Sequence, residues 1–199
     1  MKGLLSNPYH GPLAITAICT ILGLLPERLQ DLLQYELSAI QTGEWWRLVT
    51  GHLVHLGWEH TVMNLAGLWL IWHLFLNSEI SLKSCVYWLP VLALGTSAGL
   101  LLWSPEVDWY RGLSGVLHGV LVYLLLQQVR RQPRWSILGL LLIAGKLTWE
   151  QLTGPLPGSE SWVDGRVIVD AHLYGGISGV LSWGIERSYL RLIRQEVTG

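Results

Sequence analysis

A serine set between glycines is the residue of this chain best suited to nucleophilic chemistry. Ser114 stands in the segment Gly112-Leu113-Ser114-Gly115, where an uncharged apolar run of helical length begins. A serine nucleophile needs a base within hydrogen-bond reach and donors directed at the developing oxyanion, and small neighbours let such groups come close. The pattern differs from the nucleophile elbow G-x-S-x-G, because the second glycine comes one residue early and no strand pattern precedes it. Alone, it is a weak signal.

Two other apolar segments carry polar side chains that could complete such a site. His60 and Asn64 are four residues apart, so they share one helical face at the start of their segment. His172 lies about one helical turn inside another segment. Asp170 precedes His172 by two residues and therefore points to a different face, which makes it a poor third member of a triad.

The composition indicates an integral membrane protein. The 199 residues are 51% hydrophobic and 14% charged, with a mean hydropathy of +0.39, which is too apolar for an ordinary soluble domain. This length predicts one bundle, a single membrane domain over residues 1–199. The net charge of −1 gives no case for nucleic acid as a partner. Cys19 and Cys85 are expected to be small buried hydrophobic residues without a disulfide.

The hydropathy pattern predicts an all-α membrane protein with six transmembrane helices. The expected spans are 13–25, 58–76, 85–103, 112–129, 135–149 and 167–185. In the loop over 26–58, leucine and isoleucine residues recur at helical spacing from residue 29 to residue 40, which predicts a helix lying in the interface. Lys146 interrupts the fifth span, and Glu150, one turn later, is expected to pair with it.

Arginine residues predict the orientation. They cluster after the fourth span and in the C-terminal tail, as Arg130, Arg131, Arg134, Arg187, Arg191 and Arg194. By the positive-inside rule both termini are cytoplasmic, and spans two, four and six enter the membrane from the outer face. His60, Asn64, Ser114 and His172 would then lie at a similar depth on that side.

Glycine spacing suggests how these spans come together. Gly115 and Gly119 form G-x-x-x-G in the fourth span, and Gly175 and Gly179 form another in the sixth. Small residues at this spacing let two helix backbones approach closely, as a hydrogen bond between serine and histidine on different helices requires. The alternative is that these glycines serve only helix packing.

Together these residues resemble the rhomboid intramembrane serine proteases. The resemblance covers nearly the whole chain and depends on the motifs Trp46-Arg47, His55, His60 and Asn64, Gly112-x-Ser114-Gly115, and Ala171-His172-x-x-Gly175. It implies that Ser114 is the nucleophile and His172 its base, in a dyad with no acid. It also implies an oxyanion hole made of His60, Asn64 and the Ser114 backbone N–H, with Gly112, Gly115 and Gly175 in support.

One departure from the family pattern points to a branch of it. Many bacterial rhomboids have a tyrosine four residues after the serine, stacked on the catalytic histidine, whereas this chain has His118. The segment from Gly112 to Gly119 is most similar to that of rhombosortases, which process bacterial proteins with a C-terminal Gly-Gly sorting signal. The resemblance implies a bacterial inner membrane enzyme without metal or cofactor that acts on membrane-anchored substrates.

Three other classes remain as alternatives. A catalytically silent rhomboid-like binding or chaperone protein would keep the fold but lose the serine or the histidine, and both are present. A metalloprotease is disfavoured because the segment from His55 to His60 has one residue too many for H-x-x-E-H. A transporter would show broken helices in two matching halves, which are not evident.

Overall fold

Six long helices form the body of the described part of the chain. The computed structural model describes residues 8–75, 82–163 and 165–198. The long helices are α1 (His10–Gly23), α5 (Trp58–Leu74), α6 (Leu82–Trp103), α7 (Ser114–Gln128), α8 (Pro133–Thr153) and α10 (Val169–Thr198). Each coincides with one of the six apolar segments expected from the sequence. The largest difference is at α10, which continues 13 residues beyond the expected end at residue 185.

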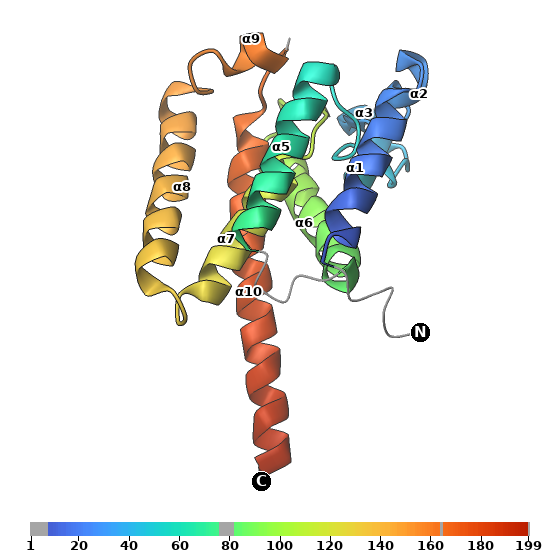
Figure 1. The fold of residues 1–199 in the computed structure, drawn as a ribbon. Coiled ribbons are helices and arrows are strands. Elements are labelled where there is room, and N and C mark those ends of the chain that lie inside the picture. The colour runs from blue at the N-terminus through green and yellow to red at the C-terminus, as the bar shows by residue number, and fades with distance from the viewer. Residues whose placement is uncertain (1–7, 76–81, 164, 199) are drawn as a thin grey trace.

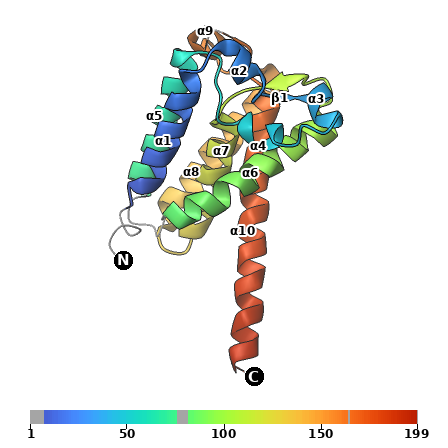
Figure 2. The same cartoon turned by 90° about the vertical axis from the view of Figure 1, so that its right-hand side faces the viewer.

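The long helices alternate in direction along the chain. As a result α5, α7 and α10 all begin toward the end of the molecule that holds the short helices α2 (Glu27–Asp31) and α9 (Ser159–Val163) (Figure 1). The C-terminal half of α10 projects beyond the other helices at the opposite end (Figures 1 and 2). Helices α5, α7 and α10 therefore begin at a common end of the bundle, and their expected entry from the outer face of a membrane stays a prediction.

Glycines bring α7 and α10 into backbone contact. A Cβ on Gly115 would lie 2.7 Å from the carbonyl oxygen of Ala171, and a Cβ on Gly119 would lie 2.7 Å from that of Gly175. In return, Cβ atoms on Gly175 and Gly179 would overlap the carbonyl oxygens of Gly115 and Gly119. Both G-x-x-x-G motifs thus lie in one interface, as their spacing predicted.

The predicted single interfacial helix in the first loop is wrong. Two short helices, α2 and α3 (Leu37–Gln41), are separated there by the strand β1 (Tyr35–Glu36). This strand pairs antiparallel with β2 (Trp109–Tyr110), with Tyr35 opposite Tyr110. Helical spacing of leucines was a misleading signal here, because pairing with a segment 74 residues later in the chain fixes the extended conformation.

A buried arginine holds the same loop together. Arg47, in the short helix α4 (Arg47–Thr50), is 4% exposed. Its Nη1 donates to the carbonyl oxygens of Asp31 at 2.6 Å and Gln34 at 3.0 Å, and its Nε donates to Glu44 at 2.6 Å. One guanidinium, with its fork of donors, thereby closes the loop that lies against the segment before Ser114.

The expected membrane spans and buried cysteines can be compared with the described helices. Among the described residues, no helix has the combination of length and apolar composition needed to cross a membrane. Cys19 is a buried free thiol. The side chain of Cys85 lies outside the described part of the chain, as do those of Asp164 and Arg194.

Candidate active site

Ser114 is the first residue of α7 and follows a turn that requires glycine. Gly112 has φ +125°, a conformation that residues with a Cβ rarely adopt. Its N–H donates to the carbonyl oxygen of Gly51 at 3.0 Å, which ties the turn to the first loop. Because Ser114 begins the helix, its own N–H has no acceptor within that helix. The Ser114 side chain is half-buried.

His172 contacts Ser114 as predicted. The Nε2 atom of His172 lies 3.0 Å from the Oγ atom of Ser114, within hydrogen-bond range. The two residues are 58 positions apart in the sequence, and the backbone contact between α7 and α10 brings their helix ends together. His172 is 6% exposed, so its imidazole is largely removed from solvent.

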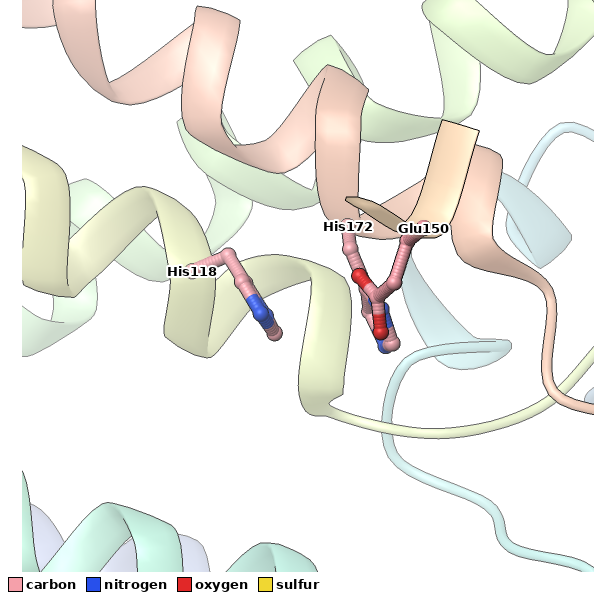
Figure 3. Close-up of side chains that lie close together, drawn as sticks. All are labelled: His118, Glu150 and His172. Carbon is pink, nitrogen blue, oxygen red and sulfur yellow. The ribbon is translucent and has the colours of Figure 1, made fainter. Parts of the chain in front are cut away.

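A carboxylate stands on the other side of this histidine, where none was expected. The Oε2 atom of Glu150, on α8, lies 3.0 Å from Nδ1 of His172, and the Glu150 side chain is 3% exposed. Figure 3 draws the side chains of Glu150 and His172 close together, with His118 beside them. The geometry thus differs from the expected pair of Ser114 and His172, because a third group, the Glu150 carboxylate, is in line with them.

Lys146 lies at the centre of this group. Its Nζ atom is 2.7 Å from Oε1 of Glu150, 2.9 Å from Nε2 of His118 and 3.4 Å from Nδ1 of His172. The predicted pairing of Lys146 with Glu150 is confirmed, and the pair lies beside His172. Two charges one turn apart in an apolar helix indicate a functional position, but they do not show which side chains the pair meets.

His118 stacks on His172. Their ring centroids are 4.3 Å apart with an angle of 17° between the planes, and Nδ1 of His118 lies 2.7 Å from the carbonyl oxygen of Ser114. This packing fits the position of His118, four residues after Ser114 and so one turn farther along the same face of α7. His118, Glu150 and His172 are the one group of three potential metal ligands in the described part of the chain. Lys146 contacts all three residues and supplies the positive charge that a metal ion would bring.

The predicted oxyanion residues lie beside the turn before Ser114. A Cβ on Gly112 would be 2.9 Å from Nε2 of His60 and 3.9 Å from Nδ2 of Asn64. The N–H of Leu56 donates to Nδ1 of His60 at 3.5 Å, which leaves the proton on Nε2. The Nδ2 atom of Asn64 donates one hydrogen to the His60 carbonyl at 3.0 Å and keeps a second.

Tyr110 also contacts the site, although the sequence did not indicate it as a functional residue. Its hydroxyl donates to the carbonyl oxygen of Gly112 at 2.5 Å and accepts from the N–H of Gly115 at 3.3 Å. Burial raises the pKa of Tyr110 to about 12, so the phenol remains a neutral donor. The Tyr110 side chain thereby holds the backbone before and after Ser114 in place. No pattern in the sequence distinguished it from the other tyrosines.

Asp170 and Glu59 take no part in this arrangement. Asp170 accepts a hydrogen bond from Oγ of Ser104 at 2.7 Å, which connects α10 to the end of α6. Its position agrees with the expectation that it faces away from His172. Glu59 is exposed, whereas His55 and His60 are buried, so these three residues do not form the zinc motif considered as an alternative.

Comparison with protein families identifies the fold. Residues 42–188 match the model of the Rhomboid domain. The chain belongs to the rhomboid family. Its members are membrane proteins and usually intramembrane serine proteases, and the match includes the end of the first loop, Ser114, Glu150 and His172. A search of curated proteins gave no significant match.

Proposed function

We propose that this rhomboid is an active serine endopeptidase with Ser114 as nucleophile and His172 as general base. The hydrogen bond between Ser114 Oγ and His172 Nε2 is the observation that carries the proposal. A silent rhomboid-like protein would have no reason to keep a half-buried serine against a buried imidazole. The nucleophile, base and oxyanion donors come from α7, α10 and α5, which begin at one end of the bundle.

The mechanism follows from these positions. His172 Nε2 takes the hydroxyl proton as Ser114 Oγ attacks the peptide carbonyl carbon. The oxygen of the tetrahedral intermediate becomes negative and is stabilised by N–H groups of His60, Asn64 and the Ser114 backbone. When the C–N bond breaks, His172 returns its proton to the leaving amine. Water, deprotonated by His172, then attacks the acyl ester and frees Ser114.

The substrate proposal is narrower and depends on the rhombosortase resemblance. The substrates are membrane-anchored proteins with a C-terminal Gly-Gly signal, cleaved near the outer face of a bacterial inner membrane. Support comes from the segment Gly112–Gly119, with His118 stacked on His172. The placement in the membrane follows from six spans with both termini cytoplasmic, as the arginine distribution predicts. A general rhomboid protease with other substrates is the second candidate.

The test combines cleavage with active-site labelling. Wild-type protein in membranes is expected to cleave a reporter with a Gly-Gly signal, a transmembrane segment and a basic tail, and to react with a fluorophosphonate probe. Ser114→Ala and His172→Ala should each abolish cleavage, and the double variant should be no worse than either, since residues acting as a unit are non-additive. Cleavage and labelling retained by Ser114→Ala would exclude the protease. Wild type that labels but cleaves only reporters without Gly-Gly would favour a general rhomboid protease.

A further inference from the structure

The contacts around Lys146 admit one consistent assignment of protons. A lysine ammonium is a donor only and an ionised carboxylate an acceptor only. Lys146 therefore donates to Oε1 of Glu150 at 2.7 Å and to Nε2 of His118 at 2.9 Å. The proton of neutral His118 is then on Nδ1, from which it donates to the Ser114 carbonyl at 2.7 Å.

The same reasoning fixes the tautomer of His172. Its Nδ1 is nearer to the Glu150 carboxylate, at 3.0 Å, than to Lys146, at 3.4 Å. Nδ1–H therefore donates to Glu150, and Nε2 presents its lone pair to the hydroxyl of Ser114, 3.0 Å away. This is the tautomer that a general base requires, and a carboxylate at Nδ1 both holds it and stabilises the imidazolium that forms during attack.

We infer that Glu150 is a positioning residue for His172, so that the site works as a Ser-His-Glu triad with Lys146 as its counter-ion. This inference rests on the proposed protease function. Glu150 does not touch the substrate and does not take the proton. It acts by keeping the Nε2 lone pair of His172 directed at Ser114.

The role of Lys146 follows from burial. Glu150 is 3% exposed, and a buried carboxylate without a partner is strongly destabilising. Lys146, at i−4 on the same helix, compensates that charge, while its second hydrogen bond holds His118 against the face of His172. Lys146 thus makes a permanent negative charge tolerable next to the base.

The alternative is an ion pair that only stabilises α8 against α7 and α10. Both roles predict that Lys146→Met destabilises the fold, because it leaves the buried charge of Glu150 without its counter-ion. They differ for the double variant Lys146→Met/Glu150→Gln, which carries no buried charge. A structural role predicts that stability and activity return together. A positioning role predicts that stability returns and activity does not.

The experiment measures kcat and KM for the cleaved reporter, the rate of fluorophosphonate labelling and the melting temperature of each purified variant. Glu150→Gln is expected to lower kcat and the labelling rate with KM unchanged. The loss should approach the roughly 10⁴-fold that accompanies a wrong tautomer when a serine protease loses its carboxylate. Glu150→Asp should recover part of kcat. The exposed Glu106→Gln is the matched control and should behave as wild type.

The outcomes separate this inference from the proposed function. The inference is overturned if Glu150→Gln labels and cleaves at the wild-type rate, or if Lys146→Met/Glu150→Gln regains wild-type kcat together with its melting temperature. Should Glu150→Gln fail to fold, the double variant carries the comparison alone. Absence of Ser114-dependent cleavage and labelling in the wild type would instead refute the protease function.

Discussion

The α-carbon of Gly175 on α10 lies so close to the carbonyl group of Gly115 on α7 that a Cβ on Gly175 would overlap the Gly115 oxygen. Gly115 follows Ser114 directly, and Gly175 comes three residues, just under one helical turn, after His172. The contact therefore sets how near the two helix ends approach, and with it the 3.0 Å between Ser114 Oγ and His172 Nε2. It is a backbone contact, and no side-chain rotation can relieve a substitution there.

Gly175→Ala is expected to separate α7 from α10 and to inactivate the enzyme. A displacement of about 1 Å between reacting groups can cost about 10²-fold in rate, and the overlap at this position should also lower the melting temperature. The matched control is Gly184→Ala on the same helix, where a Cβ would meet nothing within 4 Å. Equal activity of the two variants would show that the glycine contact does not govern the site.

The sequence was informative where one helix carries the signal. Spacing within a single segment placed His60 with Asn64 and Ser114 with His118, and the two G-x-x-x-G motifs identified the helices that pack. The role of Glu150 was not predictable in this way. The spacing of Glu150 and Lys146 shows that both lie on one face of α8. Whether this face meets His172 depends on how α8 is rotated relative to α7 and α10. The helix predicted for the first loop was wrong for a similar reason, since the extended conformation of β1 depends on its pairing with β2.

The oxyanion donors can be tested at His60 and Asn64. If each donates to the tetrahedral intermediate, His60→Ala and Asn64→Ala should each lower kcat by about 10²–10³-fold, the loss seen for one oxyanion donor in a soluble protease. The neighbouring exposed Met63→Ala on α5 is the control. Cleavage by the double variant at the wild-type rate, at equal protein level, would remove both residues from the mechanism.

His118→Ala should leave residual activity. His118 stacks on His172 without touching Ser114 Oγ, so its loss weakens the orientation of the base and leaves the base in place. An aromatic pair contributes about 0.5–1.5 kcal/mol beyond burial, which corresponds to a loss of roughly 2–10-fold in kcat. Abolished cleavage with intact stability would instead give His118 a role as essential as that of His172. Full activity would show that the stacking of His118 on His172 has no role in catalysis.

Low pH should destabilise the fold through two histidines in the first loop. Burial lowers the pKa of His52 to about 4. Burial and the nearby His60 lower that of His55 to about 3. The unfolded chain, with histidine pKa near 6.5, takes up protons first as pH falls, so the free energy of unfolding decreases below that pH. The slope is at most about 1.4 kcal/mol per pH unit for each histidine.

The measurement is the melting temperature in detergent micelles from about pH 7.5 to about pH 5, across the histidine range. His52→Gln, which can keep a hydrogen bond to Ser97 Oγ, should show a shallower decrease than wild type. The exposed His73→Gln on α5 should follow the wild-type curve. An unchanged slope in His52→Gln would mean that His52 does not take part in the acid sensitivity.

The proposed orientation can be read with reporters at two positions. Arg130 and Arg131 lie after α7, at the end of the bundle toward which α10 runs (Figure 1), and by the positive-inside rule this end faces the cytoplasm. A reporter fused after residue 199 should therefore be cytoplasmic, and one inserted at Gly158, between α8 and α9, should be external. An external signal at Gly158 alone would place the connection between α8 and α9 on the side of the membrane where the substrate is cleaved. An external C-terminal reporter would reverse the proposed placement of Ser114 near the outer face.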